Sequence, residues 1–324
     1  MRIVILDASA ANPGDLSWAP LERFGEVIPY DVTKKEQLIE RAQGAEILFT
    51  NKTVFEKEDF DKLPDLRYIG VLATGFNVVD LEAAKAHNVC VTNVPEYATF
   101  ATAQMAIALL LELADKAGIH SASVFDGGWV RSPQFCYTVS PLIELCGKTA
   151  VVVGLGKIGR RVCLILNALG MKVIGVPHTM CDSIDIDGVK IECKPLNKAL
   201  KEADVITFHC PLTNETNGLL SKPLISELKK DVLIINTARG PIVNEEDIVD
   251  ALLEGKIGGY AADVIMKEPM ESSSPLLKLK DMPNVVLTPH IAWAPKETRK
   301  RLIDAAAANL EAFLNGDPIN QVNK

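Results

Sequence analysis

Three polar side chains whose chemistry suits anion binding and proton transfer follow three late apolar segments of the chain. Arg239 lies in NTARGPIVNE, Glu268 in ADVIMKEP and His290 in TPHIAW. Histidine can exchange a proton near neutral pH, and a neighbouring carboxylate stabilises the protonated ring and orients it. The planar fork of arginine can hold a carboxylate through two parallel hydrogen bonds. Taken singly, each residue could be a surface charge, a turn residue or a packed histidine, but together they predict a catalytic set.

A glycine-rich loop precedes this set. An apolar run, Thr149–Val153, leads directly into GLGKIG at 154–159, and a helix-like segment follows. In such a strand–loop–helix unit Gly154 permits the tight turn, Gly156 leaves room for a pyrophosphate and Gly159 allows close helix packing. The anion would then lie on free N–H groups at the helix N-terminus. We therefore predict a dinucleotide site; a tight turn without a ligand is the alternative.

The residue that usually selects the dinucleotide is missing. An acid about twenty residues after the loop normally binds the ribose 2′-hydroxyl of NAD. Here Pro177 and His178 occupy that position, and no Arg or Lys stands nearby to hold a 2′-phosphate. Asp182, Asp185 and Asp187 follow instead. The sequence favours NAD and leaves NADP open.

The elements that must position these residues form two series. Short Val- and Ile-rich runs alternate with helical patterns, which is typical of βαβ units and mostly parallel sheets. The first series predicts strands at Arg2–Leu6, Glu26–Tyr30, Glu46–Thr50, Arg67–Leu72 and Val89–Asn93. The second predicts strands at Thr149–Val153, Lys172–Val176, Val189–Glu192, Val205–His209, Val232–Asn236, Tyr260–Val264 and Val285–Thr288. Two separate series imply two sheets.

Three further segments complete the expected architecture. Thr99–Gly118 is apolar along most of its length and predicts a buried helix that links the domains. Ile119–Gly147 shows no clear period, so it is either a functional loop or an arm that packs on a second subunit. A last helix is expected at Glu297–Leu314. We predict a dinucleotide-binding domain over 99–293 and a substrate domain made of 1–98 and 294–324.

Composition excludes several classes of protein. The 324 residues are enough for about two domains. With 34 Lys and Arg against 42 Asp and Glu, the net charge of −8 argues against a nucleic-acid partner. No uncharged stretch is long enough to cross a membrane, so no membrane partner is expected. Seven scattered cysteines are typical of reduced thiols in a cytoplasmic protein, and no His, Cys or Asp cluster has the spacing of a metal site.

The sequence resembles the D-isomer-specific 2-hydroxyacid dehydrogenases, and within them the glycerate dehydrogenase/hydroxypyruvate reductase branch. The resemblance runs along nearly the whole chain in matching order and spacing. It is carried by NPGDLSW, NKTVF, LATGFNVVD, TNVPEYAT, GLGKIG, HCPLTNET, NTARG, ADVIMKEP and TPHIAW. It implies an α/β protein of two doubly wound parallel-sheet domains, a Rossmann cofactor domain and a flavodoxin-like substrate domain.

The resemblance also implies roles for individual residues. His290 corresponds to the acid/base, Glu268 to the carboxylate paired with it and Arg239 to the substrate-binding arginine. The residues that correspond to cofactor contacts are Gly154, Gly156, Lys157, Ile158, Gly159, His178, Cys210, Pro211, Thr216, Thr237, Ala238 and Asp263. The substrate carboxylate would be held by Thr74 and Gly75, with Lys52 near the same pocket. Trp293 is expected to be either a packing anchor or a wall of that pocket.

The expected activity is hydride transfer between NAD(P)H and a 2-keto acid, giving a D-2-hydroxy acid. Hydroxypyruvate and D-glycerate are the preferred pair, and a homodimer is expected because the 119–147 arm carries Phe125, Trp129, Phe135 and Tyr137. A dinucleotide-sensing binding protein of the same fold, similar to the C-terminal-binding-protein corepressors, is the alternative. Formate or phosphite oxidation is a third possibility, disfavoured by the Arg–Glu–His set.

Overall fold

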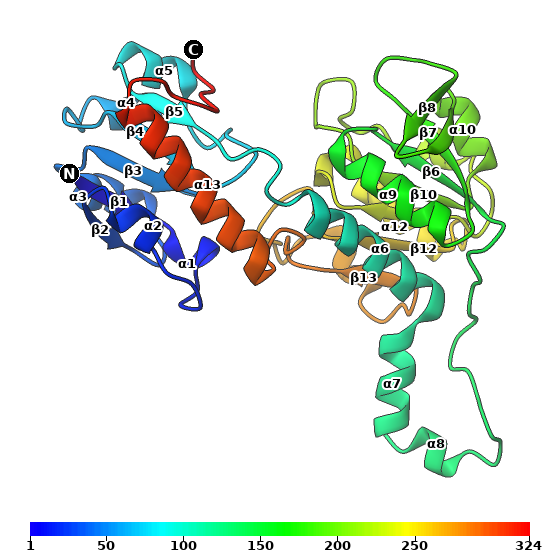
Figure 1. The fold of residues 1–324 in the computed structure, drawn as a ribbon. Helices are drawn as coiled ribbons and strands as arrows, with labels where there is room; N and C mark the ends of the chain where they lie inside the picture. Colours follow the sequence, from blue (N-terminus) through cyan, green and yellow to red (C-terminus); the bar gives the residue numbers. More distant parts are fainter. The chain divides into compact units, whose positions relative to one another are not determined.

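The chain folds into two compact α/β units in a computed structural model that describes all 324 residues. The first unit combines Met1–Ala98 with Trp293–Lys324, and the second is Thr99–Ala292 (Figure 1). The division falls one residue earlier than the sequence suggested at its second boundary. Trp293 belongs to the first unit because its ring packs against that unit's core.

The first unit is built on a five-stranded parallel sheet. Its strands are β1 (Arg2–Ile5), β2 (Glu26–Pro29), β3 (Ile47–Thr50), β4 (Tyr68–Val71) and β5 (Cys90–Thr92). Their order in the sheet is β2-β1-β3-β4-β5, and all neighbours are parallel. This is the doubly wound order of flavodoxin-like domains. It confirms the fold expected for this part of the chain.

Helices cover both faces of this sheet. They are α1 (Ala8–Ala11), α2 (Ala19–Glu22), α3 (Leu38–Ala42), α4 (Lys57–Phe60), α5 (Leu81–Ala86) and α13 (Lys296–Leu314). Side chains alternate along β1, so Val4 faces the core beneath α3, α4 and α5, while Ile3 and Ile5 face α1, α2 and α13. The α13 helix buries Leu302 and Leu310 in the second of these cores. A C-terminal helix far along the chain thus completes the N-terminal unit.

The second unit holds an eight-stranded sheet. Its strands are β6 (Thr149–Val153), β7 (Lys172–Val176), β8 (Ser183–Ile186), β9 (Val189–Cys193), β10 (Val205–Phe208), β11 (Leu233–Asn236), β12 (Gly259–Ala262) and β13 (Val285–Leu287). The order is β13-β12-β11-β10-β6-β7-β9-β8. From β9 to β12 this is the Rossmann order of a dinucleotide-binding domain. The predicted doubly wound fold is confirmed here as well.

One strand of this sheet is absent from the sequence prediction. The edge strand β8 runs antiparallel to β9, and the two form a hairpin through Asp187 and Gly188. Both turn residues have positive φ angles, 50° and 84°. Asp-Gly is the residue pair that favours such a two-residue turn. The segment around Asp185 is therefore an added strand and not a loop.

Seven helices belong to the second unit. They are α6 (Thr99–Asp115), α7 (Ala117–Phe125), α8 (Gly128–Arg131), α9 (Lys157–Ala168), α10 (Leu196–Glu202), α11 (Lys222–Ile225) and α12 (Glu245–Leu253). The first sheet face packs against α6 and α9, the second against α10, α11 and α12. The buried residues of α6 include Ile107, Leu110 and Leu113, as expected for an apolar helix. No helix of the structure is both long and apolar enough to cross a membrane.

The stretch 119–147, expected to be either a functional loop or an arm, contains α8 and most of α7. In Figure 1 these helices and the strand-free segment after them extend from the end of α6 as an arm of the second unit. Hydrogen bonds within the arm join Ser123 Oγ to Tyr137 Oη (2.9 Å) and Trp129 Nε1–H to the Phe135 carbonyl (2.9 Å). Neither helix buries a residue. Without a buried face the sequence carries no helical period, which explains why the helices were missed.

Candidate active site

His290 and Glu268 form a hydrogen-bonded pair in the second unit. The His290 Nδ1 atom lies 2.6 Å from Glu268 Oε2, and the two side chains are 30% and 33% exposed. Glu268 follows β12 and His290 follows β13, its neighbour in the sheet. Because the carboxyl ends of parallel strands share one sheet edge, residues 22 apart in sequence meet there. With Nδ1 held by the carboxylate, Nε2 is the ring atom left to exchange a proton with a ligand.

A buried aspartate fixes the turn that carries His290. Asp263, 1% exposed, accepts hydrogen bonds from the N–H groups of Ile291 and Ala292 (both 2.8 Å) and from Thr288 Oγ1 (2.6 Å). Its backbone carbonyl accepts the His290 N–H at 2.8 Å. His290 has a φ of 55°, in the left-handed region that non-glycine residues seldom occupy. Asp263 therefore holds His290 in an unusual backbone conformation that points to a functional position.

Arg239 follows β11, the neighbour of β12 in the sheet, and is the exposed residue of an otherwise buried turn. Its Nη1 donates to the Ala238 carbonyl at 2.7 Å. Asn236 shapes the turn: its amide oxygen accepts the Ala238 N–H (3.0 Å) and its Nδ2 donates to the Arg239 carbonyl (2.9 Å). A Cβ on Gly240 would lie 1.9 Å from the backbone carbon of Ile265, so the Arg239 turn packs directly on the loop that leads to Glu268. The three predicted catalytic residues thus stand on adjoining turns of one sheet edge.

The glycine loop forms an open cradle at the start of α9. Gly154 has a φ of 94°, and a Cβ there would lie 2.6 Å from the Cys210 nitrogen. A Cβ on Gly159 would lie 1.9 Å from the Gly154 carbonyl oxygen, whereas nothing lies within 4 Å of one on Gly156. Gly156 is also the N-cap residue, and no side chain caps the helix. Two glycines close the loop tightly and the third leaves space before uncapped N–H groups, as a pyrophosphate requires.

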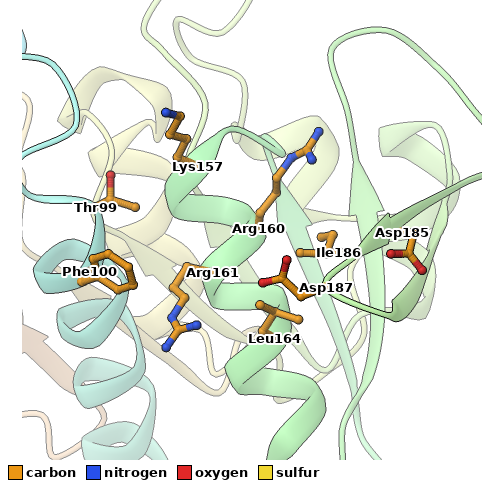
Figure 2. Close-up of a pocket in the computed structure, with 9 residues that line it drawn as sticks. All are labelled: Thr99, Phe100, Lys157, Arg160, Arg161, Leu164, Asp185, Ile186 and Asp187. Atoms are coloured by element: carbon orange, nitrogen blue, oxygen red, sulfur yellow. The ribbon is translucent and has the colours of Figure 1, made fainter.

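A cavity beside this loop carries three cations from α9. It measures 280 Å³ and is lined by Lys157, Arg160 and Arg161 with the start of α6 and the β8–β9 turn. Figure 2 shows the three side chains arising from the first turns of α9, with Asp185 and Asp187 on the β8 side. The Arg161 guanidinium lies 5.2 Å from the centre of the Phe100 ring. The cavity thus gathers three cations and the two carboxylates of Asp185 and Asp187.

The remaining predicted cofactor residues lie at the same sheet edge. His178, exposed, comes just after β7, and Thr216 closes the loop after β10 by donating its hydroxyl to the Pro211 carbonyl (2.7 Å). Cys210 is half-buried against Gly154, and Ala238 is buried in the Arg239 turn. The hydroxyl of Thr237 is buried without a partner. An orphaned buried hydroxyl at a strand end is a group that a bound carboxamide could satisfy.

His209 lies beneath the glycine loop and stays neutral. Burial lowers its pKa to about 3. Its Nε2 lies 2.8 Å from Thr207 Oγ1, and Nδ1 is buried without a partner. A ring that is neutral at every physiological pH is not a proton donor. Of the three histidines that follow strands in this unit, His178, His209 and His290, only His290 has a carboxylate partner.

The predicted substrate residues Lys52, Thr74 and Gly75 lie in the first unit. Lys52 follows β3, and Thr74 and Gly75 follow the neighbouring strand β4. Thr74 donates its hydroxyl to the Val94 carbonyl at 3.1 Å. Buried Asp7 organises the Lys52 loop by accepting the N–H groups of Asn51, Lys52 and Thr53. Asp7 went unnoticed in the sequence, where an acid after an early strand carries no distinguishing signal.

The Rossmann order, the glycine cradle and the Glu–His pair define the class of a dinucleotide-dependent dehydrogenase. Residues 107–292 match the family model described as D-isomer specific 2-hydroxyacid dehydrogenase, NAD binding domain. The chain belongs to this family of oxidoreductases, and its second unit is the NAD-binding domain.

Individual relatives agree with the family. A hydroxypyruvate reductase of Blautia hydrogenotrophica is 45% identical over the full length of both chains. A glycerate dehydrogenase of Methylorubrum extorquens is 38% identical over 89% of this chain and 88% of its own. The solved structure of the TT0316 protein from Thermus thermophilus has a TM-score of 0.87 and 33% identity, covering 99% of this chain and all of that one. These matches confirm the prediction of an NAD-dependent dehydrogenase, which was preferred to the corepressor-like alternative.

Proposed function

We propose that this enzyme reduces hydroxypyruvate to D-glycerate with NADH. The observation that carries the chemistry is the 2.6 Å contact between His290 Nδ1 and Glu268 Oε2. The substrate is supported by the names of two relatives, a hydroxypyruvate reductase and a glycerate dehydrogenase. The bound nicotinamide supplies the hydride to the carbonyl carbon. The side chains supply the proton and the charges that orient the substrate.

His290 is the proposed proton donor for the carbonyl oxygen. Glu268 accepts a hydrogen bond from Nδ1, orients the ring and leaves Nε2 to deliver a proton. The proton from Nε2 would neutralise the negative charge that develops on the carbonyl oxygen and complete the hydroxyl group. In the oxidation direction the neutral ring takes this proton back. Transfer by such a side chain contributes about 10² to 10⁴ in rate.

Arg239 is the proposed anchor for the substrate carboxylate and for the developing oxyanion. Its guanidinium is exposed and can make two parallel hydrogen bonds to a carboxylate. In the first unit, Thr74 and Gly75 on the loop after β4, together with Lys52, are proposed as further substrate-binding residues. The amide cradle of Gly154, Gly156 and Gly159, with Lys157 and Ile158, is proposed to hold the dinucleotide pyrophosphate.

A substrate panel tests the proposal. Oxidation of NADH and of NADPH is followed at 340 nm with hydroxypyruvate, glyoxylate and pyruvate at several pH values. We expect the highest kcat/KM with hydroxypyruvate and NADH, and a D-configured product by chiral chromatography. A higher kcat/KM with glyoxylate or pyruvate would assign a different keto acid. Tight NADH binding with no turnover of any keto acid would overturn the proposed activity.

We also propose that the enzyme is a homodimer formed through the α7–α8 arm. Four of its large apolar side chains are exposed: Phe125, Trp129, Val130 and Phe135, the last being 92% exposed. Apolar groups gathered on a projecting arm are typical of a surface that a second copy covers. Sedimentation should give a dimer mass at micromolar concentration. Val130→Asp with Phe135→Asp should give a monomer, whereas a monomeric unmodified protein would exclude this arrangement.

A cytoplasmic location is proposed on the state of the cysteines. All seven are free, including the exposed Cys136, Cys146 and Cys181. Free exposed thiols are typical of a reducing compartment. Fractionation of the source cells should recover the activity with the cytosolic fraction; recovery with an extracellular fraction would contradict this location.

A further inference from the structure

Glu245 is a buried carboxylate outside the predicted catalytic set. It is the first residue of α12, and only 6% of its surface is exposed. Burial raises the pKa of its carboxyl group, an effect partly offset by a hydrogen bond from Met266. Burying a carboxylate is costly unless it is partnered. The partner of Glu245 therefore shows what the residue does.

That partner is the backbone of the loop that carries Glu268. The Met266 N–H donates to Glu245 Oε1 at 2.5 Å. The preceding N–H, that of Ile265, donates to Glu268 Oε1 at 3.1 Å, and Glu268 Oε2 contacts His290. Two successive amides of one loop thus bond to two carboxylates. A shift of Met266 away from Glu245 would displace the amide that orients Glu268.

The same carboxylate also links this loop to the Arg239 turn. Gly240 packs against Ile265 so closely that a Cβ on the glycine would lie 2.4 Å from the Met266 nitrogen. From Gly240 the chain passes through a single 3₁₀ turn, Gly240–Ile242, before α12 begins at Glu245. The hydrogen bond from Met266 to Glu245 joins the start of α12 back to the loop that carries Glu268. Arg239 and Glu268 are therefore tied to each other through Glu245.

Packing holds this loop on the side of Gly240, but another side of the loop borders a cavity. The cavity measures 150 Å³ and is lined by Glu245, Ile265, Met266 and Lys267 together with residues 271 and 273–275. A backbone segment next to empty space lacks the contacts that fix a fully packed segment. The hydrogen bond from Met266 to Glu245 is then the specific restraint on this side of the loop.

We propose that Glu245 is a positioning residue for the reaction: its carboxylate holds the Ile265–Glu268 loop against the Arg239 turn. This contact thereby fixes the positions of Glu268 and His290 relative to the guanidinium of Arg239. This inference rests on the proposed roles of Arg239, Glu268 and His290. A displacement of about 1 Å in such a set can cost on the order of a hundredfold in rate.

Two variants of Glu245 separate positioning from charge. Glu245→Gln keeps an oxygen that can accept the Met266 N–H but removes the charge, and Glu245→Ala removes both. With whichever keto acid the unmodified enzyme reduces, we expect Glu245→Ala to lower kcat by about tenfold or more. Glu245→Gln should restore kcat to within about threefold. The Kd for NADH, from its fluorescence, should stay within about twofold in both.

Asp247→Ala is the matched control. Asp247 lies on the same helix turn as Glu245 and also accepts a backbone N–H. Its donor is Lys222, at 2.7 Å, which is not part of the loop that carries Glu268. The Asp247→Ala enzyme should keep kcat even if its melting temperature falls as far as that of Glu245→Ala. Equal losses of kcat in the Asp247→Ala and Glu245→Ala enzymes would overturn the positioning role, as would a Glu245→Gln enzyme no better than Glu245→Ala.

Hydrogen exchange gives a readout that does not depend on the assigned activity. In Glu245→Ala the amides of the segment 263–268 should exchange at least about tenfold faster, while those of β10 stay protected. Unchanged exchange in this segment would overturn the inference even if the enzyme reduces hydroxypyruvate. Faster exchange in a protein that reduces no keto acid would instead support the restraint and reject the proposed function.

Discussion

Asp263 fixes the backbone conformation of His290 through hydrogen bonds to three successive N–H groups, those of residues 290, 291 and 292. The carbonyl of the aspartate accepts the histidine N–H at 2.8 Å, and its carboxylate accepts the next two N–H groups. The left-handed φ of His290 is maintained by these three bonds. The presentation of the imidazole thus depends on a residue that is 1% exposed.

Asp263→Asn should therefore lower kcat by about tenfold or more without unfolding the protein. An amide nitrogen cannot accept an N–H, so one of the bonds to Ile291 or Ala292 must break. The measurement is kcat with hydroxypyruvate, alongside the melting temperature. Asp250→Asn, the same change on the exposed face of α12, is the control. Full activity in Asp263→Asn would show that the turn holds without the carboxylate.

Removing the imidazole should abolish most of the rate. His290→Ala is expected to lower kcat a hundredfold or more, since this is the usual contribution of a positioned proton donor. NADH affinity should be retained, because the glycine cradle lies on a different strand end. An unchanged kcat would exclude His290 as the acid.

Glu268→Gln should lower kcat by about tenfold or more. The amide can still contact Nδ1 of His290, which lies 2.6 Å from Glu268 Oε2, but it removes the negative charge opposite the ring. The measurement is kcat with hydroxypyruvate, alongside the Kd for NADH. An unchanged kcat would contradict the role of the pair.

Arg239→Lys should act mainly on substrate binding. Lysine keeps the charge but cannot form two parallel hydrogen bonds to a carboxylate. We expect KM for hydroxypyruvate to rise about tenfold, the equivalent of about 1.4 kcal/mol. Arg131→Lys, on the exposed arm, serves as the control and should leave KM unchanged. Normal KM in Arg239→Lys would argue against a bidentate clamp.

Asp204 should contribute acid-sensitive stability to the second unit. Burial raises the pKa of Asp204, but the Thr149 N–H and the Lys229 ammonium, at 2.8 and 3.0 Å, together lower it below the ordinary aspartate value of 3.8. A carboxylate with a lowered folded-state pKa stabilises the fold above 3.8, and the benefit disappears as pH falls through the lowered value. Asp204→Asn should cost about 1 kcal/mol at pH 7.

Urea midpoints of Asp204→Asn and unmodified protein at pH 7 and near pH 3 check this. The difference at pH 7 should shrink at the lower pH. Asp281→Asn, an exposed carboxylate in the same unit, should show little difference at either pH. If the difference in urea midpoint is as large near pH 3 as at pH 7, the loss of stability does not come from the charge of Asp204.

Much of the fold was predictable because parallel strands buried on both faces produce continuous apolar runs. β3 and β10, each buried along all four residues, are typical of this pattern. The β8 strand was missed because Ser183–Ile186 is short and partly polar. Its Asp187-Gly188 turn is the one local signal that could have revealed it.

The three catalytic candidates were predictable because the strands that precede them are recognisable as apolar runs. The segments that carry Arg239, Glu268 and His290 each follow a recognisable strand, so their common sheet edge follows from topology. The supports were not predictable. Glu245 has the sequence context of an ordinary first-turn acid, and the sequence assigned Asp263 only a cofactor contact, not its support of the His290 turn. Their roles depend on which backbone amides fold back onto them, and no local pattern encodes that.

The C-terminal helix has a consequence for synthesis on the ribosome. When the first ninety-eight residues emerge, the sheet face that Leu302 and Leu310 will cover is still bare. The intervening unit has its own two cores and can acquire its shape first. The apolar surface of the first unit therefore stays uncovered in a nascent chain until α13 has been translated.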